Sequence, residues 1–492
     1  SDDLDKVAKI GQQLIQQYPQ SKVVPDVLAT LGNMSAQAVD FDRAAKYLEE
    51  AARHGTAGEG SAEMLRASAV IKAHLGDVEG AKQNYEKVIQ AAQPGQAKRD
   101  AALGLADILE RAGDYRAATS ALQTAATEGA RSAAIEYRLG YALMQAGRGA
   151  EAGRAFANAS ELGSASSDPE DREGAAGARY YLSQGVITEY EAVGFDGNTA
   201  QSIQKKFAAL ASAEGELVAV IELQSPKWAL ASLARLASVY GHGAEFLSKA
   251  PAPAGLDEAG AEKFKAALGA RANELRGKSE EAKSTCAAKA LELQVFTQAA
   301  RACLLGEALD PDPERRVAPP QRRGAPPAGP VGELQKRIAK NSKDYQALGE
   351  LATLYLSVAD PYAAKLVLDK AAEGGASSEV YNLRGVVAFA LGYPQLAYDE
   401  FQSALKADPT NAKAIFSLGI HAMQRGAFRD ACTLIEEAQR LSPQDPFILL
   451  TLSKARREAG DTDGEGAALE HALALDPYFL PALLAKAQRL ER

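Results

Sequence analysis

The side chains best suited to metal binding are scattered along this chain of 492 residues. The five histidines are His54, His74, His242, His421 and His471. None has a second histidine four residues further on, or a cysteine two or three residues away. Pairs of ligands at such close spacings are the usual sequence signature of a metal site. The sequence therefore predicts no metal site and no cofactor.

Motifs for catalysis are also missing. Gly80-Ala-Lys and Gly104-Leu-Ala are not phosphate-binding loops, and no GxSxG or GxGxxG joins a strand to a helix. Adjacent carboxylates such as Glu280 and Glu281 lie in helical sequence, where neighbouring side chains point about 100° apart and do not form an acid–base pair. We expect no catalytic residues and a non-enzymatic protein. An enzyme would need a site assembled within residues 178–310.

Two of the three cysteines, Cys286 and Cys303, are candidates for a disulfide. Thr297 lies between them and is a residue type that caps helix N-termini. A chain that turns back there would bring the two thiols within disulfide range, and an oxidising compartment would join them. The alternative is one uninterrupted helix with two buried thiols, because neither Gly nor Pro marks a turn. Cys432 is expected to remain a free, packed thiol.

A repeat of helix pairs organises the C-terminal part of the chain. Pro409, Pro443 and Pro477 are spaced 34 residues apart, and each follows a helix-like segment. Gly and Ala recur at equal offsets between them, accompanied by large residues such as Phe401 and Phe428. Antiparallel helices approach closely where a small residue faces the partner helix, and one pair cannot bury its apolar face alone. The pattern predicts an all-α solenoid of stacked helix pairs.

This pattern resembles the tetratricopeptide repeat (TPR) family, with Leu-Gly in a first helix, Ala-x-x-x-Phe in a second helix and a following Pro. We count eight such repeats, four near each end of the chain. The resemblance implies a right-handed superhelix. Its first helices would line a concave groove that binds peptides or helices of partner proteins.

Breaks in the repeat pattern divide the sequence into four parts. They are an N-terminal TPR array at 1–164, an all-helical segment at 165–310, a linker at 311–332, and a C-terminal TPR array with a capping helix at 333–492. The linker contains seven prolines and four arginines. Proline removes hydrogen-bond donors and disrupts helices, so we expect an extended or disordered segment. Proteases should cut it first between Arg315 and Arg323.

The middle segment carries a second, narrower resemblance. Pro226-Lys-Trp228, Tyr240, the run from Ala250 to Leu256, and Phe264 are similar to a module of deltaproteobacterial TPR proteins. That group includes envelope proteins of the myxobacterial gliding-motility machinery. The resemblance implies a scaffold in the periplasm or at the outer membrane. The chain begins at Ser1 rather than Met, so a lost signal peptide or lipoprotein anchor is part of this expectation.

Charge and hydropathy narrow the partners to other proteins. The chain carries 64 acidic and 55 basic residues, a net charge of −9, without a long basic run in the repeats. Nucleic acid and anionic membranes are therefore poor partners. No stretch reaches the roughly 18–20 apolar residues of a membrane-spanning helix.

The TPR resemblance places positions 2, 5, 9 and 12 of each first helix in the groove. In the C-terminal array these positions predict an apolar binding groove formed by Phe389, Phe416, Ile420, Met423, Phe447 and Leu450. For each of them the alternative is packing between repeats. TPR domains that clamp a terminal carboxylate use Lys and Asn there, and Asn382 is a lone match. The N-terminal groove positions, including Tyr137 and Tyr141, are more polar and suggest a second surface.

Together these features predict a scaffold that binds partner proteins within a bacterial envelope assembly, such as a motility machine. The alternative is a soluble assembly factor or chaperone-type adaptor in the cytoplasm or periplasm. The oligomeric state does not follow from the sequence.

Overall fold

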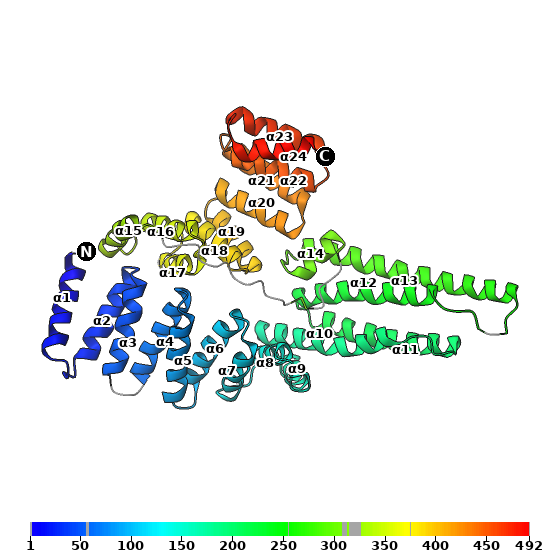
Figure 1. The fold of residues 1–492 in the computed structure, drawn as a ribbon, viewed down its shortest axis with the longest axis horizontal. Coiled ribbons are helices and arrows are strands. Elements are labelled where there is room, and N and C mark those ends of the chain that lie inside the picture. Colours follow the sequence, from blue (N-terminus) through cyan, green and yellow to red (C-terminus); the bar gives the residue numbers. More distant parts are fainter. Residues whose placement is uncertain are drawn as a thin grey trace. The chain divides into compact units, whose positions relative to one another are not determined.

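A computed structural model describes residues 2–55, 59–253, 255–307, 312–313, 326–373 and 375–491. Within these residues the chain forms 24 helices and no strand, which confirms the predicted all-α class. The helices make two compact units, coloured along the chain in Figure 1. We call them the array unit (α1–α6 with α15–α24) and the long-helix unit (α7–α14).

The array unit combines the first six helices with the last ten. Its N-terminal helices are α1 (Asp2–Gln17), α2 (Val24–Gln37), α3 (Phe41–His54), α4 (Glu59–His74), α5 (Val78–Ala91) and α6 (Gln96–Arg111). Its C-terminal helices are α15 (Ala328–Lys340), α16 (Tyr345–Ser357), α17 (Pro361–Ala372), α18 (Ser378–Ala390), α19 (Pro394–Ala407), α20 (Ala412–Arg425), α21 (Phe428–Leu441), α22 (Pro446–Glu458), α23 (Thr462–Leu475) and α24 (Leu480–Leu490).

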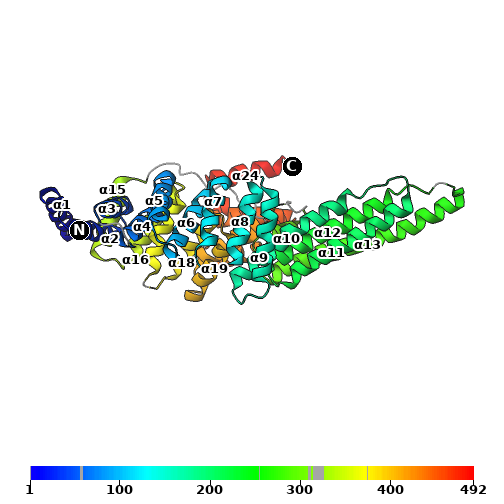
Figure 2. The same ribbon diagram turned by 90° about the horizontal axis from the view of Figure 1, so that it is seen from below.

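The long-helix unit begins with helices of repeat length and continues with longer ones. Its helices are α7 (Tyr115–Thr127), α8 (Ala133–Gln145), α9 (Gly149–Gly163), α10 (Pro169–Ala192), α11 (Thr199–Glu222), α12 (Pro226–Ser248), α13 (Glu258–Glu292) and α14 (Gln298–Leu305). Helices α10 to α13 run side by side in Figures 1 and 2.

Short polar and glycine signals define the hairpins of the repeats. An aspartate caps the start of several second helices, as Asp77 does by accepting a hydrogen bond from the Gly80 amide at 2.9 Å. The turn between the two helices of a repeat needs a left-handed residue, which is Gly392 before α19 and Gly426 before α21. Val39 takes this conformation with φ 54°, which is unusual for a β-branched residue.

Small residues let the two helices of each hairpin approach, as the repeat pattern predicts. A Cβ atom added to Gly385 would lie 2.3 Å from a ring carbon of Phe401. One repeat later, a Cβ on Gly419 would lie 2.6 Å from Ile435. Any larger side chain would force the hairpin apart, so these glycines are set by packing.

The first repeats and the second array share one apolar core within the array unit. Phe41, Leu48 and Ile71 belong to the same buried cluster as Ile338 and Leu351. The Gln335 side chain also donates a hydrogen bond to the Val39 carbonyl oxygen at 3.2 Å. The repeat register of the sequence does not reveal this long-range contact, because it reports only neighbouring repeats.

The structure divides the chain at other positions than the predicted domain boundaries. The border between the two compact units falls between α6 and α7, inside the predicted N-terminal array. The division at 164, 310 and 332 stays a prediction. Helix α15 begins at Ala328 and has Pro330 in its first turn, where proline is tolerated, so the extended segment ends before residue 332. The predicted cutting site between Arg315 and Arg323 lies outside the described residues.

Candidate functional site

The predicted groove residues of the C-terminal array lie on the first helices of three consecutive hairpins, α18, α20 and α22. Phe389, Phe416, Ile420 and Met423 are half-buried, so each contacts neighbouring repeats and also exposes part of its side chain. Phe416 and Met423 pack against the buried cluster around Ile415 and Ile435. These four residues can offer apolar surface while helping to hold the repeats together.

Phe447 is the most exposed member of the predicted groove, with 58% of its surface accessible. Its ring meets Phe479 edge-on, with 4.7 Å between ring centroids, and Phe479 itself is buried. An aromatic ring that is held at one edge and open elsewhere is well suited to anchor a ligand side chain.

Leu450 does not present a binding surface. It is 5% exposed and belongs to a core formed with Leu449, Leu469 and Phe479. Ala482 of the last helix, α24, completes this core. The groove position of Leu450 is therefore filled by packing against the chain's own last helices. For this residue the packing alternative holds.

Polar side chains on the same helices are already engaged. Asn382 is buried, and its Oδ1 accepts a hydrogen bond from Ser417 at 3.0 Å. It is therefore used between α18 and α20 rather than presented to a terminal carboxylate. Lys413 and Glu379 form an exposed ion pair at 2.7 Å across the same two helices.

A neutral histidine lies next to Phe389. His421 is buried, its ring centroid lies 5.4 Å from that of Phe389, and its Nε2 lies 2.8 Å from the Pro394 carbonyl oxygen. Since a carbonyl oxygen only accepts, Nε2 carries the proton. Burial lowers the pKa of His421 to about 4, so the ring is neutral near pH 7. An apolar ligand here would meet no buried histidine charge.

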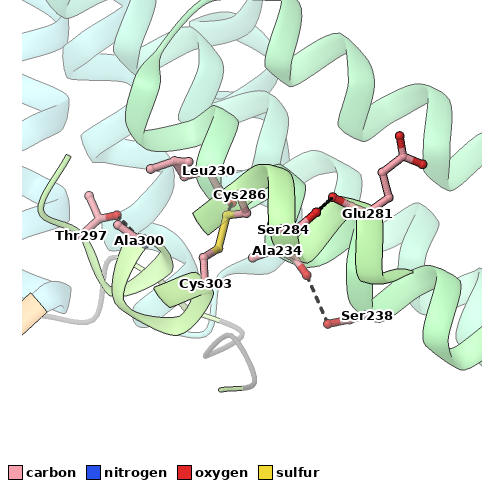
Figure 3. Close-up of a disulfide and its surroundings, with 9 residues drawn as sticks. All are labelled: Leu230, Ala234, Ser238, Glu281, Ser284, Cys286, Thr297, Ala300 and Cys303. Atoms are coloured by element: carbon pink, nitrogen blue, oxygen red, sulfur yellow. Dashed lines mark hydrogen bonds between the residues drawn. A yellow bond between two sulfur atoms is a disulfide. The ribbon is translucent and has the colours of Figure 1, made fainter. Parts of the chain in front are cut away.

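The two candidate disulfide cysteines meet in the long-helix unit (Figure 3). Helix α13 ends at Glu292, and α14 begins at Gln298 with Thr297 as its N-cap, accepting a hydrogen bond from the Ala300 amide. This turn excludes the single uninterrupted helix. The Cα atoms of Cys286 and Cys303 lie 5.7 Å apart, and their sulfur atoms are bonded. Cys432 is a free, partly buried thiol.

A buried lysine lies at another point of the long-helix unit. The Lys206 Nζ donates to the Tyr190 carbonyl oxygen at 2.5 Å and lies 3.3 Å from His242 Nδ1. Burial lowers its pKa to about 8, and the attraction of Glu191 only partly opposes this. The ammonium also lies 3.9 Å from the centre of the Tyr190 ring. Its contacts tie α10, α11 and α12 together, which is a structural role.

The tyrosines predicted for an N-terminal groove are used internally. Tyr141 is buried, and its hydroxyl donates to the Asp312 carboxylate at 2.9 Å. Tyr181 and Gln145 donate to the same carboxylate at 2.7 Å each. Tyr137 packs edge-on against Trp228, with 5.9 Å between ring centroids. Sequence reasoning missed this cluster because its members come from distant helices.

The described residues contain neither a cluster of metal ligands nor a membrane-spanning helix. Within these parts of the chain, no three His, Cys, Asp or Glu side chains lie where they could share a metal ion. No helix in the same parts is both long and apolar enough to cross a bilayer.

Comparison with known proteins identifies the repeat. Residues 103–169 match the family model described as tetratricopeptide repeat. The match assigns this repeat to residues 103–169, which include α7, α8 and α9. No curated protein sequence matches the chain.

Several solved structures are similar to parts or most of the chain. YrrB, titled a TPR protein with an unusual peptide-binding site, is 20% identical over 32% of this chain and 86% of its own, with a TM-score of 0.28. TTC0263, titled a thermophilic TPR protein in Thermus thermophilus, is 20% identical over 33% of this chain and 89% of its own, with a TM-score of 0.31. Yeast Tom70 is 13% identical over 95% of each chain, with a TM-score of 0.29.

Proposed function

We propose that this TPR chain is a non-enzymatic scaffold whose C-terminal array binds a segment of a partner protein. The observation that carries the proposal is the half-open apolar face of α18, α20 and α22. It consists of Phe389, Phe416, Ile420, Met423 and Phe447. We keep the name "C-terminal groove" for these five residues. Aromatic and aliphatic side chains spaced along one face suit an amphipathic helix or an extended peptide.

Substitution of Phe447 with Ser tests this role with little structural cost. Its ring is largely exposed, so the melting temperature should change little, while partner binding should fall. The assay is affinity capture from the native host with mass spectrometry, followed by titration of the purified partner. Leu291→Ser is a matched control, because Leu291 is a partly exposed apolar residue on α13 of the other unit. Equal partner affinity in Phe447→Ser and the control would contradict the proposal.

Phe416→Ser tests the half-buried part of the same face. Opening a cavity there costs on the order of 2–5 kcal/mol if the ring acts mainly as core, because burial and packing are lost. A groove residue would lose the partner with a smaller loss of stability. A large fall in melting temperature with partner capture intact in the folded fraction would assign Phe416 to the core.

We propose further that the scaffold works in the bacterial envelope, as a periplasmic or outer-membrane-associated part of an assembly such as a motility machine. The resemblance of the Trp228 region supports this location, and so does the pairing of Cys286 with Cys303, because disulfides persist in oxidising compartments. A lipid anchor belongs to the same proposal. Rapid alkylation of host cells followed by mass spectrometry should find both thiols oxidised. Two alkylated thiols would favour the cytoplasmic adaptor instead.

A further inference from the structure

A cavity of about 150 Å³ lies between the second helices α17 and α19, over the first helix α18. Its walls are mainly apolar and include Leu368, Val387, Ala388 and Leu391. A cavity of this size and lining can hold a benzene ring. It therefore fits one aromatic or branched aliphatic side chain.

The cavity lies on the opposite side of α18 from the C-terminal groove. Val387, Ala388 and Leu391 line the cavity, whereas Phe389 belongs to the groove. At about 100° per residue, Val387 and Leu391 point about 160° away from Phe389, and Ala388 points about 100° away. A ligand in the cavity would thus leave the groove free.

The repeat that forms the cavity differs from its neighbours at two core positions. Arg384 Nη2 and Glu400 Oε1 form an ion pair at 2.7 Å, and Glu400 is 8% exposed. One repeat later, residues 34 positions further on, the same places hold Leu418 and Leu434. Two repeats later these places hold Leu452 and Ala468. In the preceding repeat, which is 33 residues earlier, they hold Leu351 and Val367. Well-packed apolar residues are often at least as stabilising as a buried ion pair. Stability alone therefore does not explain why this repeat has Arg384 and Glu400 at these positions.

The ion pair leaves one buried acceptor unused. Glu400 is one of the cavity-lining residues, and its Oε2 atom is buried and has no hydrogen-bond partner among the described residues. Burial raises the pKa of this carboxyl, although Arg384 opposes the effect. A buried acceptor without a donor is costly, and a ligand with an N–H group would relieve that cost.

The rim of the cavity includes two large, exposed side chains, Tyr393 and Leu396, next to the charged Lys365 and Asp369. Tyr393 and Leu396 are 44% and 45% exposed. In the next repeat the equivalent residues are Ala427 and Asp430, which are small or charged. Large apolar side chains around a cavity are typical of places where a partner side chain inserts.

We propose that this cavity is a second peptide-binding site of the chain, separate from the C-terminal groove. Its ligand is a partner residue with a large apolar side chain. The side chain enters the cavity, and an adjacent N–H donates to Glu400 Oε2. The rim residues Tyr393 and Leu396 cover the flanking peptide. The proposal does not depend on the groove, because the two sites use opposite faces of α18.

Two small probes test the apolar contact in the cavity and the hydrogen bond to Glu400 separately. N-benzylacetamide carries a phenyl ring next to an N–H group, and benzyl acetate replaces that N–H with an ester oxygen. Methyl NMR spectra of the full chain would follow Leu368, Val387 and Leu391 during titration with each probe. We expect saturable shifts with both probes and about fivefold tighter binding of the amide, the factor given by one net hydrogen bond.

The variant R384L/E400L restores the apolar pair of the neighbouring repeats. It should fold, shown by an unchanged circular dichroism spectrum, and it should lose the preference for the amide. Phe447→Ser should bind both probes as the natural chain does, which separates this site from the groove. Removal of the exposed ion pair by Glu379→Gln is a control that should change nothing.

Equal binding of amide and ester to the natural chain would overturn the proposed role of Glu400. Absence of saturable shifts at the cavity methyls would overturn the site itself. Both results come from the natural chain, so they stand even if the double variant fails to fold. An amide preference that persists in folded R384L/E400L would also contradict the proposal.

Discussion

Apolar groove positions that are equivalent in the repeat have different surroundings in the two units. Tyr141 follows Leu139-Gly140 on α8 and is buried, whereas Ile420 follows Leu418-Gly419 on α20 and remains half-buried. Both occupy groove positions of a first helix. The Tyr141 ring contacts Tyr181 of α10, with 5.8 Å between ring centroids, and its hydroxyl donates to Asp312, whereas Ile420 keeps part of its surface open. A groove position becomes a binding surface only where no further part of the chain covers it.

Trp228→Ala should give the largest effect, because it removes the centre of the covered cluster. Trp228 is fully buried, and its ring centroid lies 5.2 Å from that of Tyr180. Loss of a buried Trp costs about 3–5 kcal/mol, whereas Phe447→Ala on the open side should cost about 0.5 kcal/mol or less. Urea unfolding followed by circular dichroism measures both values. Similar losses in the two variants would remove the proposed distinction.

Loss of the disulfide should destabilise the long-helix unit by about 3 kcal/mol, because it closes a short loop with 17 residues of sequence separation. Cys286→Ser with Cys303→Ser makes this change. The chain has one tryptophan, Trp228, so its fluorescence reports unfolding of this unit. Cys432→Ser in the array unit is the control and should leave the fluorescence transition unchanged. An unchanged unfolding transition in the variant without both cysteines would mean that the disulfide contributes nothing to the stability of this unit.

Stability of the long-helix unit should rise between about pH 8 and pH 9.5. The unfolded state keeps the Lys206 proton up to its usual pKa of 10.5, whereas the folded state releases it near 8. The unfolded state then binds more protons, so increasing pH favours folding, by about 1–3 kcal/mol. Above this window, tyrosines such as Tyr190, whose pKa burial raises, act in the opposite direction. In Lys206→Met, the free energy of unfolding measured by Trp228 fluorescence should rise less over this pH range. A rise that persists in this variant would assign it to other groups.

Tyr181→Phe should have the smallest effect on the covered side. It removes one hydroxyl donor to Asp312 and keeps the ring, so the expected loss is about 1 kcal/mol. Asp312→Asn should cause a similar loss, and the double variant should lose less than the sum of the two. A strictly additive double-mutant cycle in urea unfolding would show that the contact contributes nothing to stability.

The repeat register of the sequence predicted much of the fold. Small residues such as Gly385 face large ones such as Phe401, as the spacing implied. Thr297 caps α14, because N-capping depends on the residue type at a single position. Such features are local, so a pattern along the chain is sufficient to identify them.

The fate of individual side chains could not be predicted in the same way. Leu450 occupies a groove position but is covered by the last helices, and the Tyr141 hydroxyl donates a hydrogen bond to Asp312. The core shared by Leu48 and Leu351 joins residues that are about three hundred positions apart. The polar pair Arg384 and Glu400 would have been visible as a departure from the repeat, although the cavity beside it would not.

The most direct test of the open C-terminal groove is photo-crosslinking in host cells. A benzophenone amino acid would replace Phe447 on the groove or Thr433, an exposed residue on the second helix α21, as the control. We expect that Phe447 crosslinks to one partner protein, that Thr433 does not, and that Phe416→Ser in the same chain abolishes the product. Identical products from both positions, or products within the chain alone, would contradict the proposed groove.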